Sequence, residues 1–172
     1  MPIRSMTRCA LFAGSLCLCA WIALPLGNIA ITLQTLALFL SLGVLGGKLG
    51  TITCCVYLLL GAVGLPVFSG FQGGLGMLLG TTGGYLVGFL AAALVYWLVT
   101  VLFPKAVLPA MLLGQLACYI LGTLWYGNMY LQGNLPAALL QGVIPYLIPD
   151  GIKIVAAWIL SKRLRITPPS GA

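Results

Sequence analysis

Acidic side chains and histidine are almost missing from this sequence. Asp150 is the single carboxylate side chain among 172 residues, there is no His, and Lys and Arg together number eight. Charged residues make up 5% of the chain and hydrophobic residues 62%, whereas a soluble domain carries about 25% charged residues. So few charges cannot cover a water-facing surface, and the apolar runs are long enough for helices rather than barrel strands. The sequence therefore predicts an integral membrane protein built from helices.

The same absences exclude most catalytic chemistry. Acyl transfer or hydrolysis needs a nucleophile beside a base, and without His only a Ser–Lys arrangement remains, yet no Ser lies near Lys153 in the sequence. Metal-dependent phosphotransfer needs several carboxylates or a phosphate-binding loop, and the chain has one Asp and no G-x-x-x-x-G-K-[ST] motif. We therefore expect a protein that is not an enzyme.

Cysteines and basic residues indicate neither a metal site nor a nucleic-acid partner. The six Cys lie inside apolar runs, where Cys acts as a small packing residue, and no C-x-x-C pair occurs. The eight basic residues are spread between apolar runs and form no patch or stripe of the kind that binds nucleic acid. We expect no metal, no cofactor and no nucleic acid, but contact with membrane lipids.

Six apolar segments predict an all-α, polytopic membrane protein with a single transmembrane domain over residues 1–172. The predicted spans cover roughly 9–26, 33–46, 49–65, 85–103, 106–126 and 136–162. The first could be the core of a signal peptide, but we interpret it as a retained helix because further apolar runs and no soluble domain follow it. The last contains Pro145 and Pro149 and should be kinked or broken there.

The basic residues predict how the chain crosses the membrane. With a cytoplasmic N-terminus, seven of them fall on the cytoplasmic side: Arg4, Arg8, Lys48, Lys105, Lys162, Arg163 and Arg165. The three outer connections, expected as loops at 25–32, 64–84 and 127–135, contain no Lys or Arg. By the positive-inside rule we expect both termini in the cytoplasm.

The longest irregular stretch, residues 64–84 (GLPVFSGFQGGLGMLLGTTGG), is rich in glycine and carries no charge. Glycine allows backbone dihedrals closed to other residues. A solvated loop would be expected to carry charges, so this Gly-rich segment should fold back against the protein as a lid or re-entrant element. Non-helical backbone at membrane depth is tolerated where it lines a cavity.

Asp150 and Lys153 form the most unusual pair in the chain. Residues three apart share one face of a helix, and each charge costs about 2.5–3.5 kcal/mol at the centre of a membrane helix. The pair either neutralises itself to hold helices in register or captures a ligand. We favour capture, because the predicted topology brings the Gly-rich segment to the same outer end of the sixth span. A lone acid serves at most one step of proton coupling, so the energy for transport would come from another component.

Other candidate ligand contacts are polar or aromatic side chains that the topology places near this pair. Amides could come from Gln72 and Gln34, while packing or an interfacial belt explains Gln34 and the aromatics equally well. The complete candidate set is Asp150, Lys153, Gln72, Tyr85, Gln34, Thr32, Phe68 and Tyr146.

Small residues in the first span permit close approach of another helix. Ala10 and Gly14, or Ala13 and Cys17, are spaced four apart on one helix face. The pattern suits packing within the chain, and it also suits docking on a helix of a partner protein.

Several segments resemble one family, the BioY proteins, which are biotin-binding S components of energy-coupling-factor (ECF) transporters. The matching stretches are ITLQT (31–35), YLLLGAVGLPVF (57–68), SGFQGGLGMLL (69–79), GTTGGYLVGF (80–89) and IPYLIPDGIK (144–153). They occur in family order and cover most of the chain from Pro25 to Arg165. Two departures stand out: Thr81 replaces a common Pro, and residues 27–30 are poorer in proline than usual.

The resemblance implies six helices, a site near the outer face, and biotin as the ligand in a bacterial cytoplasmic membrane. It implies that Asp150 and Lys153 contact the ligand and that Gln72 supplies an amide from the Gly-rich segment. We hypothesise that Asp150 accepts hydrogen bonds from the ureido N–H groups. Lys153 would either keep Asp150 ionised or pair with the biotin carboxylate.

The resemblance further implies a membrane coupling subunit and cytoplasmic ATPases as partners, docked partly on the small-residue face of the first helix. Some family members occur without dedicated partners. A stand-alone facilitator for biotin or another small vitamin, and a structural or channel-forming bundle, therefore remain alternatives.

Overall fold

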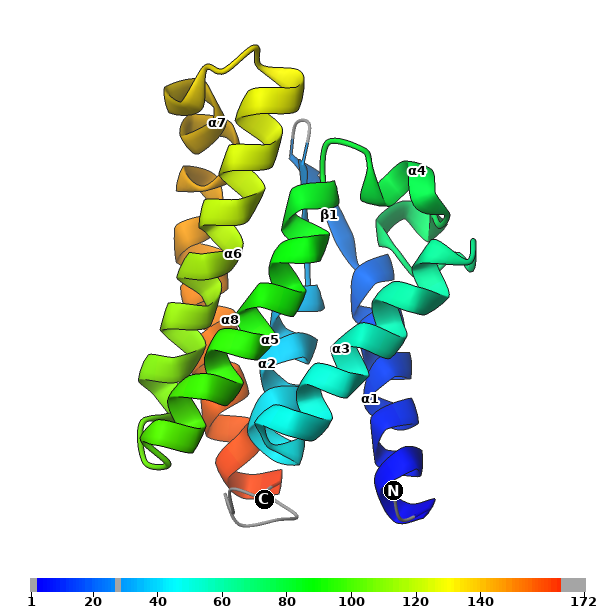
Figure 1. The fold of residues 1–172 in the computed structure, drawn as a ribbon, viewed down its shortest axis with the longest axis vertical. Coiled ribbons are helices and arrows are strands. Elements are labelled where there is room, and N and C mark those ends of the chain that lie inside the picture. The colour runs from blue at the N-terminus through cyan, green and yellow to red at the C-terminus, as the bar shows by residue number, and fades with distance from the viewer. Residues whose placement is uncertain (1–2, 27–28, 165–172) are drawn as a thin grey trace.

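The chain folds into a mostly helical bundle, for which the computed structural model describes residues 3–26 and 29–164. The long helices run roughly along one axis (Figure 1). They are α1 (Ile3–Trp21), α2 (Gln34–Leu45), α3 (Gly47–Ala62), α5 (Gly83–Leu102), α6 (Val107–Tyr130) and α8 (Ile144–Leu164). The shorter elements are strands β1 (Ala23–Leu26) and β2 (Ile29–Thr32), a 3-10 turn (Ser69–Phe71), α4 (Leu75–Leu78) and α7 (Leu135–Gly142).

Two ends of the bundle differ in charge. The start of α1 and the end of α8 lie at the same end as the α2–α3 and α5–α6 connections, whereas the strands, α4 and α7 lie at the opposite end (Figure 1). The described basic residues outside the interior all belong to the first end: Arg4, Arg8, Lys48, Lys105, Lys162 and Arg163. Arg165 lies outside the described residues. We call the first end the basic end and the second the hairpin end.

The outer surface of the helices is apolar enough for lipid. Four helices, α1, α5, α6 and α8, are long and apolar enough to cross a membrane, and α2 and α3 are shorter apolar helices. Many large hydrophobic side chains point outward, among them Leu98 at 61% and Ile152 at 66% exposure. Such a surface is stable against hydrocarbon and not against water, so the chain is a multi-pass membrane protein.

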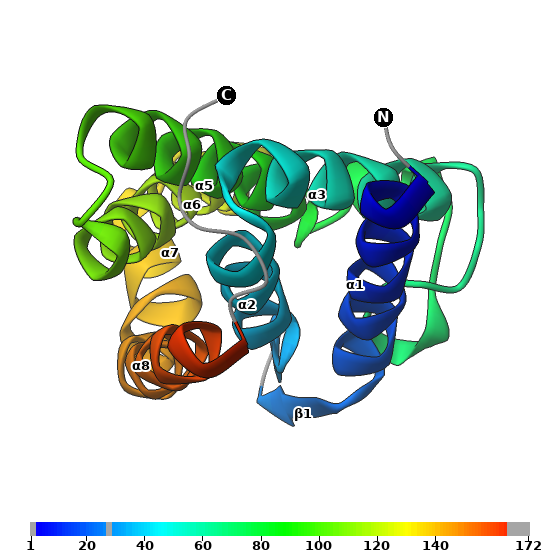
Figure 2. The ribbon, with the colours of Figure 1, turned by 90° about the horizontal axis from the view of Figure 1, so that it is seen from below.

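Helix α2 lies at the centre of the bundle, with α1 on one flank and α7 and α8 on the other (Figure 2). Ten of its twelve residues are buried, and it packs against α1, α3, α5 and α8. A Cβ added at Gly43 would lie only 2.5 Å from Ser161 Cβ, so small residues set the close approach of α2 and α8.

The structure corrects the expected loop at 25–32 and the end of the first helix. The segment from Ala23 to Thr32 holds an antiparallel hairpin in which Ala23 pairs with Thr32 and Pro25 with Ala30. Helix α1 therefore ends at Trp21 instead of continuing to Leu26. Pro25 lacks the N–H that a helix interior requires, and pairing of two short strands provides partners for the backbone groups that face the other strand.

The last two predicted helices also differ from expectation. Helix α6 continues to Tyr130, four residues beyond its predicted end, so the turn expected at 127–135 is shorter. The segment 136–162 is divided at Val143, between α7 and α8. The break precedes Pro145, which then sits in the first turn of α8 where its missing N–H costs nothing, and Pro149 is accommodated inside α8.

The Gly-rich segment folds back onto the bundle. The N–H of Gly74 donates to the carbonyl of Gly61 in α3 over 2.7 Å, and Gly74 has a φ of 95° that favours glycine. Phe68 is 1% exposed and packs its ring against Gly61 and edge-on against Tyr57. The Gly-rich segment is therefore a covering element that packs on the helices, and it is not a solvated loop.

Candidate functional site

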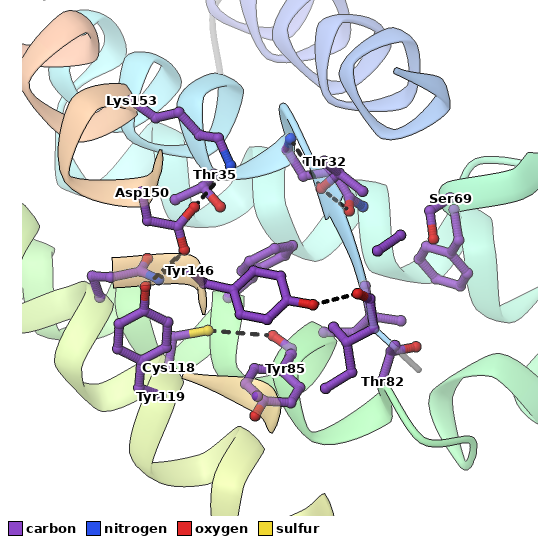
Figure 3. Close-up of a pocket in the computed structure, with 18 of the residues that line it drawn as sticks. Thr32, Thr35, Ser69, Thr82, Tyr85, Cys118, Tyr119, Tyr146, Asp150 and Lys153 are labelled. Carbon is purple, nitrogen blue, oxygen red and sulfur yellow. Dashed lines mark hydrogen bonds and ion pairs between the residues drawn. The ribbon is translucent and has the colours of Figure 1, made fainter. Parts of the chain in front are cut away.

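A cavity opens between the hairpin, the Gly-rich segment and the central helices (Figure 3). Its empty volume is about 680 Å³, a figure that includes space open to solvent at the mouth. Polar lining residues are Thr32, Gln34, Thr35, Ser69, Thr82, Gln115, Asp150 and Lys153, and apolar or aromatic ones include Phe68, Met77, Tyr85, Leu86, Phe89, Tyr119 and Tyr146.

Asp150 is the centre of a buried polar network at one wall of this cavity. Lys153 Nζ donates to Asp150 Oδ1 over 2.8 Å, Tyr119 Oη donates to Oδ2 over 2.8 Å, and Gln115 Nε2 donates to Oδ2 over 3.0 Å. In Figure 3 Asp150 lies between Lys153 and Tyr119. Asp150 is 5% exposed and Lys153 8%. The carboxylate is thus paired and hydrogen-bonded, which is the condition for keeping a charge in an apolar interior.

Sequence reasoning missed the two α6 members of this network. Gln115 and Tyr119 are four residues apart and so share the face of α6 that meets α8. A signal was present, because Gln115 is the lone amide inside the apolar run 106–126. A polar side chain within such a run needs a partner, and Asp150 provides it.

Gln34 and Thr32 both line the cavity, but their polar groups are largely used within the protein. The Thr32 hydroxyl donates to Gln34 Oε1 over 2.8 Å, and Gln34 Nε2 donates to the Tyr57 hydroxyl. Tyr57 in turn donates to the carbonyl of Val67 over 3.0 Å. This chain of hydrogen bonds ties the hairpin and the start of α2 to the Gly-rich segment.

Tyr146 and Tyr85 form aromatic walls of the cavity. The Tyr146 hydroxyl donates to the carbonyl of Ile29, which attaches α8 to β2. The Tyr85 ring lies in a slot beside Gly122 of α6 and Gly142 of α7, where an added Cβ would overlap with it. Both aromatic side chains therefore have fixed positions set by their neighbours.

Gln72 is the candidate that the structure does not bring to the cavity. Its side chain is exposed and does not line the cavity, while its carbonyl accepts the N–H of Phe68 over 2.9 Å. The Gly-rich segment instead presents Phe68, Ser69 and Met77 to the cavity.

Aromatic side chains hold the Gly-rich segment on both sides. Trp21 of α1 donates its indole N–H to the carbonyl of Pro66 over 2.8 Å and stacks on Phe71, with ring centroids 4.8 Å apart. From α6, Trp125 donates to the carbonyl of Gly80 over 3.1 Å, and Tyr130 donates to that of Leu79 over 2.8 Å. These bonds keep the covering element seated beside the cavity.

The two small-residue pairs of α1 point in different directions. Ala13 is buried within the bundle, whereas Ala10 and Gly14 are exposed, and a Cβ added at Gly14 would meet no atom within 4 Å. Packing inside the chain accounts for Ala13. The face with Ala10 and Gly14 is open to another helix.

Together these features define a class: a multi-pass membrane protein with a cavity whose wall carries a buried ion pair. Comparison with known proteins is more specific. The model of the BioY family matches residues 1–169. The biotin transporter BioY of Thermotoga maritima is 38% identical over 165 residues, covering 95% of this chain and 96% of that protein. The probable biotin transporter BioY of Pyrococcus horikoshii is 34% identical, covering 96% and 98%. The chain belongs to the BioY family.

A solved structure has the same fold. It is the crystal structure of the S-component for biotin from an ECF-type ABC transporter, with a TM-score of 0.87 and 24% sequence identity, covering 96% of this chain and 92% of that one. The overall arrangement of this chain is thus one that a sequence only 24% identical also adopts.

Proposed function

We propose that this chain is the membrane-embedded, high-affinity biotin-binding subunit of an ECF-type ABC transporter for vitamin uptake. The observation that carries the proposal is the buried Asp150–Lys153 pair at the wall of a cavity, in a chain of the BioY family. A pair that served only to hold helices together would have no reason to line a cavity. The function is binding and delivery, with no chemical conversion of the ligand.

Biotin has the chemistry that this cavity accommodates. Its ureido ring carries two N–H donors and a carbonyl, its thiophane ring is apolar, and its valerate tail is anionic. The polar network around Asp150 and Lys153 suits the ureido end, and the side chains of Phe68, Tyr85 and Tyr146 suit the apolar ring. Thr32 and Gln34 complete the proposed site at the start of α2. Gln72 does not contact the ligand in this proposal, and any role it has is confined to the Gly-rich segment.

We further propose six crossings of a bacterial inner membrane, with both termini in the cytoplasm. The grouping of the described basic residues at one end of the bundle supports this orientation. Membrane-impermeant thiol labelling of a Cys introduced at Lys105 or at Gln132, in a Cys-free background, measures it. Labelling from outside of a Cys introduced at Lys105 would show that the chain has the opposite orientation.

The proposed partners are a membrane coupling subunit and cytoplasmic ATPases, with the open Ala10–Gly14 face of α1 as the docking surface. A stand-alone facilitator would need none of them. Uptake of radiolabelled biotin into liposomes with and without the ATPase module separates the two, because a facilitator equilibrates biotin without ATP.

The ligand itself is tested by purification without added vitamin, followed by mass spectrometry of the bound small molecule. We expect biotin. Added biotin at about 100 times its dissociation constant should stabilise the protein by about 2.7 kcal/mol in thermal unfolding. Recovery of thiamine or riboflavin, or no stabilisation by biotin, would contradict the proposed ligand.

Gly122→Ala is expected to weaken biotin binding by about 1–3 kcal/mol, because the added methyl group displaces the Tyr85 ring towards the cavity. The measurement is calorimetric titration of purified protein with biotin. Gly151→Ala is the matched control, since a Cβ there meets no atom within 4 Å although Asp150 is its neighbour. Equal affinity in the two variants would show that the Tyr85 slot does not shape the site.

A further inference from the structure

Two elements that are far apart in the sequence form walls of the cavity, the β1–β2 hairpin and the Gly-rich segment. Both lie at the hairpin end of the bundle (Figure 1). Thr32 lines the cavity from the hairpin and Phe68 from the Gly-rich segment, and helices α2 and α3 separate the two in the chain. Trp21, just before β1, contacts the Gly-rich segment at the surface. A second connection between the two walls is buried.

Tyr57 of α3 makes this buried connection. Its side chain is fully buried and does not line the cavity. The Tyr57 hydroxyl accepts from Gln34 Nε2 and donates to the carbonyl of Val67 over 3.0 Å. Gln34 Oε1 in turn accepts from the Thr32 hydroxyl over 2.8 Å. One hydroxyl group therefore links β2, through Gln34, to the Gly-rich segment.

The direction of these hydrogen bonds is fixed by the last acceptor. The Val67 carbonyl only accepts, so the proton of the Tyr57 hydroxyl must point to it. The Tyr57 oxygen then accepts, which requires the NH₂ of Gln34 to face it and Oε1 to face Thr32. A flipped Gln34 amide would set its oxygen against the Tyr57 oxygen. Loss of the Tyr57 hydroxyl would leave two buried groups without a partner, the Gln34 NH₂ and the Val67 carbonyl.

The ring of Tyr57 holds the next residue of the same segment. The Phe68 ring lies edge-on to it, with centroids 5.6 Å apart, and is 1% exposed. One side chain thus fixes two consecutive residues, Val67 by a hydrogen bond to its backbone and Phe68 by a ring contact. Because Phe68 lines the cavity, a shift of Tyr57 changes the cavity wall although Tyr57 lies outside the lining.

We propose that Tyr57 is a positioning residue of the binding site. Its hydroxyl sets the position of the hairpin relative to the Gly-rich segment, so that these two walls of the cavity open together and not separately. The inference rests on the proposed function and adds to it a residue that does not contact the ligand. The edge-on contact with Phe68 needs only the ring, so removal of the hydroxyl isolates the effect of the hydrogen bonds.

The first test removes the hydroxyl and keeps the ring. Tyr57→Phe is expected to weaken biotin binding about 10-fold in calorimetric titration, because Gln34 Nε2 loses its acceptor and Val67 its donor. Tyr130→Phe is the matched control, since it also removes a hydrogen bond to a carbonyl of the Gly-rich segment, that of Leu79. Tyr130 is 43% exposed, so solvent replaces its hydroxyl, and we expect a loss of less than about 3-fold. If Tyr57→Phe loses no more affinity than Tyr130→Phe, the inference fails while the proposed function stands.

Hydrogen exchange of the ligand-free protein separates positioning from general stability and does not depend on biotin. Tyr57→Phe should raise amide exchange about 10-fold or more in peptides of both the hairpin and residues 64–74, while α5 and α6 exchange as in wild type. Faster exchange in the Gly-rich segment alone would show that Tyr57 anchors only that segment. An equal increase in all peptides would show a merely structural role, and either result overturns the inference. If wild-type protein does not bind biotin, the proposed function fails, and the positioning role fails with it.

Discussion

Asp150→Asn is expected to abolish high-affinity biotin binding and to destabilise the protein by about 3–5 kcal/mol. The substitution removes the negative charge and leaves the Lys153 ammonium buried without its partner, from which it is 2.8 Å away in the native protein. It also replaces one acceptor oxygen by an NH₂ group. That group no longer accepts from Lys153, Tyr119 or Gln115, so at least one native hydrogen bond to the carboxylate is lost. Thermal unfolding in detergent and titration with biotin measure the two effects.

The double variant Asp150→Leu with Lys153→Met is the control for this prediction. It removes both charges, and replacement of a buried ion pair by apolar residues often leaves the stability of a protein unchanged or increases it. We expect it to recover part of the lost stability, since Gln115 and Tyr119 still lack their acceptor, and to recover no binding. If Asp150→Asn binds biotin with wild-type affinity, Asp150 is not part of the binding site.

Phe68→Ala is expected to destabilise the protein by about 3–5 kcal/mol and to impair biotin binding in the same step. The Phe68 ring is 1% exposed, lies edge-on to Tyr57 with centroids 5.6 Å apart, and fills the space that Gly61 leaves open. Removal of the Phe68 ring leaves a cavity at the contact that anchors the Gly-rich segment on α3. Because Phe68 and Ser69 line the cavity, loss of the anchor also changes the site.

Phe71→Ala provides the matched control in the same segment. Phe71 is 63% exposed and contributes a stacked contact with Trp21, so its loss should cost about 1 kcal/mol or less. Chemical unfolding of the two variants, followed by biotin titration, distinguishes them. Similar losses of stability would show that the segment is held by its surface contacts and not by the buried ring.

The helices and the charged pair could be predicted from the sequence. Long apolar runs indicate the helices, and acidic residues are so rare in this chain that Asp150 stands out. Long apolar runs gave helix positions close to those observed, and Asp150 was conspicuous as the only acid. The hairpin at Ala23–Thr32 was not predicted: its first strand was predicted as the end of the first helix and its second as part of a loop, because strands of four residues carry too little pattern to be distinguished from either. The break predicted at Pro145 lies two residues earlier, at Val143, because a proline disturbs the residue before it and fits the first turn that follows, and α8 continues through Pro149, where a second kink or break was predicted.

The partners of the charged pair required the three-dimensional structure. Lys153 was evident at three residues from Asp150 in sequence, but Gln115 and Tyr119 lie 35 and 31 residues away. Only the packing of α6 on α8 shows that they share one carboxylate. The exposure of Gln72 likewise depends on how the Gly-rich segment folds, which its many glycines leave undetermined in the sequence.

The pairing of Asp150 with Lys153 also has an electrical consequence. Opposite unit charges bound to each other cancel, so the membrane potential exerts no net force on the site itself. The field acts on the one negative charge of a bound carboxylate ligand, and against a negative-inside potential inward movement costs about 2.3 kcal/mol per 100 mV. A biotin anion would thus be carried inward against the voltage, and its accumulation would have to draw on a source such as nucleotide hydrolysis.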